Sequence, residues 1–240
     1  MCRQRGAMPY NNSLGLTLAR PVMNIRNMSA TEFAKYKLIM AAIKLFGQKG
    51  VDAVSLREIN REAGAKNNAA LHYHFGTKYG LIEAVVHYIQ AAFDEEREPV
   101  LSNLESRAKT HPITVEEIMK AHVDPYIDII QGYDWGLHAI RAIARMEFDG
   151  DSDLHTLLSE SAGVAIKREF TLLRLALPDL PIKELKQRYN FLVNSIITGF
   201  ADCQNLHQSY LGNLTLKNLE GLAELYIKLS TSALSAPQNA

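Results

Sequence analysis

The sequence is poor in cysteine and has no long apolar run. Only Cys2 and Cys203 occur among its 240 residues, which is too few for a disulfide framework or a cysteine-based zinc site. No apolar stretch approaches the roughly 18 residues that a transmembrane helix needs. The N-terminus carries arginines but no apolar segment that ends at a small-residue cleavage site. We therefore expect no secretory signal and a cytoplasmic protein.

Patterns typical of enzymes and metal proteins are also missing. We find no nucleophile elbow, no glycine-rich phosphate loop and no paired carboxylates in the sequence. His72 and His74 are two residues apart, so on a helix their side chains point about 200° apart and cannot share a metal ion. We expect no catalytic residues, no metal site and no cofactor.

Charge is balanced over the whole chain but not along it. The formal net charge is zero, yet the first 80 residues carry twelve Lys and Arg against four Asp and Glu. The remainder has the opposite excess. A basic end joined to an acidic remainder is typical of a nucleic-acid-binding module coupled to a domain with another role. A chance distribution that includes a basic leader is the alternative.

Apolar residues recur at three- and four-residue spacing from Ser29 onward, which predicts an all-α protein. Residues 1–28 show no such periodicity and are expected to form a flexible leader. The patterns Ser29-x-x-Glu32 and Ser55-x-x-Glu58 are typical of capping boxes and predict the starts of two helices.

Proline and glycine positions set the expected ends of the next helices. We expect the second helix to stop at Gly64, the third to end at Phe75, and the fourth to stop near Glu98, before Pro99. In a later helix, Pro125 should cause a kink or a break. The last helix is expected at about residues 216–234.

Two short helices that meet at a glycine-containing turn and pack on an earlier helix form a helix-turn-helix unit. On the second of them, a turn of about 100° per residue places Leu71 and Phe75 inward and Ala69 and Tyr73 outward. Asn can pair with adenine, and Tyr, Thr and Lys can reach phosphates. The candidate DNA-binding residues are Ser55, Lys66, Asn67, Asn68, Ala69, His72, Tyr73, Thr77 and Lys78.

Residues 31–86 resemble the DNA-binding domain of the TetR (tetracycline-repressor-like) family of bacterial transcriptional regulators. The matching stretches are AAIKLFGQKG, VSLREINREAGA and ALHYHFGTKYGLIEAVV. Compared with the usual family pattern, Asn60 replaces an alanine, His72 replaces a tyrosine, and one extra residue lies within KNN at 66–68. Either Asn67 or Asn68 is therefore the candidate for a contact with a base.

The resemblance implies an N-terminal three-helix helix-turn-helix DNA-binding domain followed by a helical-bundle ligand-binding and dimerisation domain. We expect the leader at 1–28, the DNA-binding domain at 29–80, the effector-binding and dimerisation domain at 81–235, and a tail at 236–240. The last two long helices would form a homodimer whose recognition helices, about 34 Å apart, read a palindromic operator. Burial of these helices inside a monomer is the competing explanation.

The implied function is a ligand-responsive transcriptional regulator, in the first place a repressor, that responds to a small-molecule effector. A helical enzyme or a protein–protein adaptor is the alternative. Arginine together with aromatic residues suits a ligand with a carboxylate or acyl group. The candidate effector residues are Tyr126, Trp135, His138, Arg141 and Arg145. A tryptophan in an ordinary core with arginines on the surface is the alternative reading of this cluster.

Overall fold

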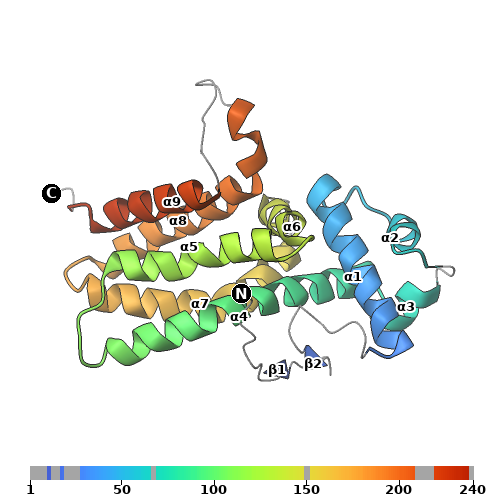
Figure 1. Cartoon of the computed structure of the whole chain (residues 1–240), viewed down its shortest axis with the longest axis horizontal. Helices are drawn as coiled ribbons and strands as arrows, with labels where there is room; N and C mark the ends of the chain where they lie inside the picture. The colour runs from blue at the N-terminus through green and yellow to red at the C-terminus, as the bar shows by residue number, and fades with distance from the viewer. Residues whose placement is uncertain are drawn as a thin grey trace, which may run out of the picture.

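The chain folds almost entirely into helices, as the sequence predicts. A computed structural model describes residues 10–11, 17–18, 28–65, 69–148, 152–208 and 219–237 (Figure 1). The exception is a pair of two-residue antiparallel strands, β1 (Tyr10–Asn11) and β2 (Thr17–Leu18), which no pattern in the sequence predicts.

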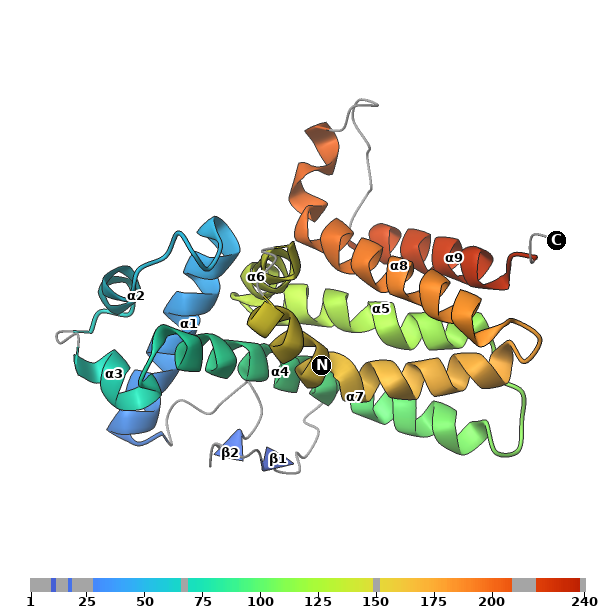
Figure 2. The ribbon, with the colours of Figure 1, turned by 180° about the vertical axis from the view of Figure 1, so that it is seen from behind.

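The helices fall into a small group at one end of the molecule and a larger bundle at the other (Figures 1 and 2). They are α1 (Ala30–Lys49), α2 (Leu56–Glu62), α3 (Ala69–Phe75), α4 (Lys78–Arg107), α5 (Val115–Gly132), α6 (Gly136–Phe148), α7 (Ser152–Ala176), α8 (Ile182–Ala201), the 3₁₀ helix η2 (Cys203–Gln208) and α9 (Leu219–Ser235). Helix α4 starts beside α3 and runs the length of the bundle, so it is shared by both groups.

Side-chain caps begin the helices where the sequence predicts them. Ser29 and Glu32 form a complete capping box at α1, in which each side chain bonds to the backbone N–H of the other. At α2, the Ser55 hydroxyl accepts the Glu58 N–H, but the Glu58 carboxylate pairs with Lys49 instead. Only half of that predicted box therefore forms, because Lys49 offers the carboxylate a charged partner.

Two helices continue through prolines: Pro99 was expected to end one of them, and Pro125 to kink or break the other. Helix α4 runs through Pro99, and α5 is one helix through Pro125. Each proline removes one backbone donor from its helix. Near Pro99, Arg168 of α7 bonds to Glu98 and Glu105, which lie on either side of it. The local preference of proline therefore does not by itself decide where these helices end.

The two groups of helices meet where α6 lies against α1. Gly47, which is buried in α1, faces the backbone of His138 so closely that an added Cβ would lie 2.3 Å from the His138 carbonyl oxygen. Only glycine permits this approach of two helix backbones. The α1–α6 contact is therefore tight, and it couples the small group to the bundle.

One apolar core runs through both groups. Phe46, Ile59 and Leu71 are fully buried among α1–α3, and Met119 and Phe200 are fully buried in the bundle. Within the part of the chain that the structure describes, no helix has both the length and the apolar character needed to span a membrane.

Candidate DNA-binding surface and effector cavity

Helix α3 is held to the molecule by its inner face and leaves its outer face open. Leu71 is fully buried, and Phe75 is half-buried under the ammonium of Lys35, which lies 5.8 Å from the ring centroid. Tyr73 is 80% exposed, which is unusual for so large a ring, and His72 is also exposed. The expected inward and outward faces of this helix are thus observed.

Several candidate DNA-binding residues lie where α3 ends and α4 begins, and two of them form hydrogen bonds there. The His72 ring nitrogen Nδ1 lies 2.9 Å from the Gly76 carbonyl oxygen. The Thr77 hydroxyl caps α4 by accepting the Gly80 N–H at 3.0 Å, and Lys78 is the first residue of that helix. Ser55, Thr77 and Lys78 therefore lie at helix starts, where exposed backbone N–H groups also favour anions.

The structure leaves part of this site undescribed. Lys66, Asn67 and Asn68 lie outside the described residues, and so does the side chain of Ala69. The choice between the two asparagines as the base-contacting residue therefore stays open.

Acidic side chains at this end of the molecule are engaged by neighbouring lysines. Glu62 pairs with Lys44, and Glu58 pairs with Lys49, which lowers the pKa of the Glu58 carboxyl mainly through that hydrogen bond. Two arginines of α2, Arg57 and Arg61, are exposed and form no ion pair with a described carboxylate. The sequence analysis did not select them, although their place on the first helix of the helix-turn-helix suits contacts with the DNA backbone.

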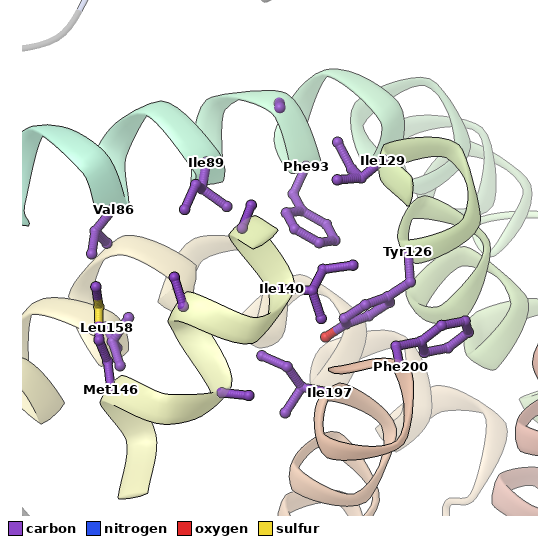
Figure 3. Close-up of a cluster of buried hydrophobic side chains, with 14 of the residues drawn as sticks. Val86, Ile89, Phe93, Tyr126, Ile129, Ile140, Met146, Leu158, Ile197 and Phe200 are labelled. Atoms are coloured by element: carbon purple, nitrogen blue, oxygen red, sulfur yellow. The ribbon is translucent and has the colours of Figure 1, made fainter. Parts of the chain in front are cut away.

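A cavity of about 1370 Å³ lies inside the bundle, enclosed by α4, α5, α6, α7 and α8. Its inner walls are apolar, and wall residues from α4, α5, α6, α7 and α8 belong to the buried hydrophobic cluster drawn in Figure 3. Among these wall residues are Val86, Ile89 and Phe93 of α4, Tyr126 of α5, Ile140 of α6, and Ile197 of α8. The cavity opens between α7 and α8, where Lys167, Lys186 and Asn190 are exposed.

Charged and polar side chains are buried at the inner end of this cavity. His122 Nδ1 donates to Glu169 Oε2 at 2.8 Å, and the Tyr189 hydroxyl donates to the same oxygen. Burial by itself would raise the pKa of Glu169, but His122, together with Arg97 and Tyr189, outweighs it and lowers that pKa. Glu169 is therefore ionised although it is completely buried.

The same surroundings act on the phenols in the opposite direction. Burial raises the pKa of Tyr126 to about 12, and burial with the charge of Glu169 raises the pKa of Tyr189. Both tyrosines are thus hydrogen-bond donors at neutral pH and not anions. Arg97, which is 5% exposed, lies with its guanidinium 4.9 Å from the Phe93 ring centroid.

Only one of the five candidate effector residues lines the cavity. Tyr126 does, whereas the other four are absent from its lining. Trp135 stacks on Tyr133 at 4.6 Å and meets Tyr88 edge-on, so it belongs to the packing between helices. The Arg141 guanidinium donates to the Ala201 carbonyl and to Gln204.

The remaining two candidates also lie elsewhere. The backbone of His138 contacts Gly47 at the α1–α6 crossing, and Arg145 is exposed. Helix spacing placed these residues on one face of α6, but that face turns toward α1 and η2. Sequence reasoning also missed Arg97, His122 and Glu169, which lie on three different helices.

Two family models match successive parts of the chain. Residues 38–85 match "Bacterial regulatory proteins, tetR family", and residues 120–227 match "Tetracyclin repressor-like, C-terminal domain". The first match covers α2, α3 and parts of α1 and α4, and the second covers most of α5 through α9.

Individual relatives share mainly the N-terminal segment. The chain is 35% identical over 74 residues to the "Probable HTH-type transcriptional regulator YttP" of Bacillus subtilis, covering 31% of this chain and 35% of that protein. It is 39% identical over 79 residues to the "HTH-type transcriptional dual regulator CecR" of Shigella flexneri, covering 33% of each. The chain thus spans about a third of the length of these relatives.

A solved structure extends the similarity of fold to nearly the whole chain. The transcriptional regulator FadR from Bacillus subtilis, in complex with stearoyl-CoA, superposes with a TM-score of 0.56 at 14% identity and covers 82% of this chain and 98% of its own. The sequence motifs, the helix-turn-helix and the two family matches lead to one assignment, and the prediction made from the sequence is confirmed: the chain belongs to the TetR family of bacterial regulatory proteins.

Proposed function

We propose that the chain is a sequence-specific DNA-binding transcriptional regulator, in the first place a repressor, that acts in the cytoplasm and is released from its operator by a small molecule. The observation that carries the proposal is α3, whose apolar face is anchored by Leu71 while Tyr73 stands 80% exposed. A short helix with one buried face and one open, polar face is suited to enter the major groove. Arg57, Arg61 and Lys78 supply positive charge for the phosphates beside it.

The regulator acts as a homodimer through α8 and α9. Both helices expose large apolar side chains: Phe191 of α8 is 78% exposed, and Leu225 and Leu229 of α9 are 43% and 55% exposed. Exposed apolar residues that gather on adjoining helices mark an interaction surface. A two-fold dimer presents two copies of α3 to a palindromic operator.

Effector binding acts on the DNA-binding helices through α4 and α6. The cavity wall contains Val86 and Ile89 of α4, and α4 continues directly from α3 through Gly76 and Thr77. It also contains Ile140 of α6, whose other side packs on α1 at Gly47. A molecule that favours a different position of these helices shifts the population toward dimers whose recognition helices are wrongly spaced for the operator.

The cavity is the effector site in this proposal. Its volume of about 1370 Å³ exceeds the roughly 300–1,000 Å³ of typical ligand pockets, and its apolar walls are interrupted by few polar groups. The FadR structure of similar fold contains stearoyl-CoA, which supports a role for this fold in holding a large ligand. A helical enzyme is the second candidate in principle, but we find no observation among the described residues that favours it.

A gel shift with the DNA upstream of the protein's own gene tests DNA binding. We expect a sequence-specific band that weakens steeply as salt rises, because Lys and Arg release counterions from the phosphates. Tyr73→Ala combined with Lys78→Ala should remove the band, whereas Phe148→Ala, which removes an equally exposed ring of α6, should not. An unchanged band from the double variant would rule out α3 as the DNA-contacting helix.

Light scattering at graded concentrations tests the dimer. Leu229→Asp places a charge on the exposed face of α9 and should yield monomers, while Val100→Asp on α4, an exposed apolar residue outside the proposed interface, should leave the dimer intact. A dimer that resists Leu229→Asp but dissociates with Val100→Asp would locate the interface elsewhere.

A further inference from the structure

The inner end of the cavity holds nitrogen atoms that have no protein partner. Arg97 and His122 both line the cavity and are 5% and 1% exposed. Among the described residues, Arg97 Nε and His122 Nε2 have no hydrogen-bond partner, and the same is true of Oε1 of Glu169, which is absent from the cavity lining. Buried polar groups are normally satisfied, so two such atoms beside one cavity indicate groups that a ligand completes.

The guanidinium of Arg97 makes contacts, but it forms no ion pair with a described carboxylate. It lies over the Phe93 ring and beside the Tyr126 phenol. Asp94 and Glu169 act on its charge only at longer range: Asp94 accepts a hydrogen bond from Gln90, and Glu169 accepts from His122 and Tyr189. A buried cation without a carboxylate in contact is costly, and the cost falls when an anion binds to it.

The protonation of His122 follows from its partner on the other side. A carboxylate can only accept, so His122 Nδ1 carries the hydrogen that bonds to Glu169. The groups that face this ring from the neighbouring helices are Arg97 of α4, Glu169 of α7 and Tyr189 of α8. With an anion at Nε2, each of the two ring N–H groups meets a negative oxygen.

We propose that the effector is an organic carboxylate with a bulky apolar body, whose acid group binds Arg97 Nε–H and His122 Nε2–H at the inner end of the cavity. This inference rests on the proposed role of the cavity as the effector site. Two N–H groups suit the two oxygens of one carboxylate, and charge-assisted hydrogen bonds of this kind are the strong ones. The walls from α4, α6 and α8 hold the apolar body.

The apolar walls favour a carboxylate with an apolar body over other anions. A sugar acid or a nucleotide would place hydroxyl groups against Val86, Ile89 and Ile140, which cannot bond to them. At the opening, Lys167 and Lys186 attract an anion, although Glu160 stands at the same opening and weakens that attraction. Specificity therefore comes from the inner end of the cavity and not from its opening.

Matched pairs of probes that differ only in charge test the proposal. Dodecanoate and methyl dodecanoate share a straight body, and naphthoate and methyl naphthoate share a ring body. We expect calorimetric titration of the purified full-length protein to show roughly 10- to 100-fold tighter binding of at least one acid than of its ester. Arg97→Met should remove this preference, and Lys167→Met at the opening should retain it.

Every other outcome counts against the proposal. Equal binding of acid and ester, a preference that survives in Arg97→Met, or no binding of either acid would overturn it. If Arg97→Met does not fold, as judged by circular dichroism, Arg97→Lys decides, because it keeps the charge but lacks the Nε–H; an undiminished preference would then overturn the proposal. None of these titrations contains DNA. A failed gel shift and a missing preference for the acid over its ester are therefore separate results.

Discussion

At the end formed by α1–α3, charged side chains lie on the surface and pair with one another, whereas the bundle of α4–α9 buries an arginine, a histidine and a glutamate. In the first region, Glu58 and Glu62 pair with lysines on the outside. In the second, Arg97, His122 and Glu169 are at most 5% exposed. The two regions share one continuous core of apolar residues, so this difference is not one of packing.

The difference corresponds to what each region binds in the proposed function. DNA is larger than the protein domain and can bind only to an exposed face. The residues that contact it therefore contribute little to the stability of the fold. A small molecule is enclosed, so the residues that bind it are desolvated before it arrives. We therefore expect substitutions in the first region to change DNA affinity with little loss of stability, and substitutions inside the bundle to reduce stability.

The largest expected effect is that of Glu169→Ala. Removing the carboxylate leaves His122 and Tyr189 buried without their acceptor, and breaking a buried charged pair costs about 3–5 kcal/mol. Urea unfolding measures this loss. Glu160→Ala, an exposed glutamate of the same helix, should stay within about 0.5 kcal/mol of the wild type. Equal losses of stability in the two variants would mean that the buried hydrogen bonds of Glu169 contribute no more to stability than an exposed glutamate does.

A second variant tests the contact between the regions. Gly47→Ala places a methyl group 2.3 Å from the His138 carbonyl oxygen, which α1 and α6 can only relieve by moving apart. Overpacking of this kind costs about 1–3 kcal/mol. The matched control is Gly163→Ala in α7, where nothing lies within 4 Å of the new methyl group and a gain of roughly 0.5–1 kcal/mol is expected. A neutral Gly47→Ala would contradict a tight α1–α6 contact.

Two lysines at opposite ends of α4 test which region of the molecule contacts DNA. Lys78 is the first residue of α4, and Lys109 follows its last turn at the far end of the bundle. Lys78→Ala should reduce the slope of log affinity against log salt by about 1, as expected for one lost phosphate contact, without reducing stability. Lys109→Ala should change neither quantity. Equal slopes for the two variants would place the DNA elsewhere.

The surface of α3 could be predicted from the sequence, and the cavity could not. The inward position of Leu71 and the outward position of Tyr73 follow from the turn of a single helix. A cavity depends instead on how five helices leave space between them, and no spacing within one helix contains that information. Arg97 follows two glutamates and precedes a third in the sequence, which is typical of a solvated face, yet it is buried.

The predicted end of one helix was wrong for a related reason. Pro99 was expected to end a helix, but α4 continues to Arg107, and Arg168 of α7 bonds to α4 residues on both sides of the proline. Local preference predicts where a chain tends to stop, while a contact from a distant residue decides whether it does. The candidates on α6 show the same limit: their spacing on one face was correct, but that face turns away from the cavity.

The smallest expected effect concerns one of the places where the bundle pairs charges on its surface, between Arg168 of α7 and Glu98 and Glu105 of α4. Hydrogen bonds from Arg168 lower the pKa of Glu98 and of Glu105. A carboxyl group whose pKa is lowered by folding stabilises the fold at pH values above its ordinary pKa of 4.5. This stabilisation is lost as the pH falls through the lowered pKa. Arg168→Met should therefore be less stable than the wild type at pH 7, by about 0.2–1 kcal/mol because both carboxylates are partly exposed, and the gap should close in acid. Arg174→Met, an exposed arginine of the same helix, should show no such pH dependence. If the gap at pH 7 instead approached the loss from Glu169→Ala, surface and interior charges would contribute alike, and the contrast between the two regions would not hold.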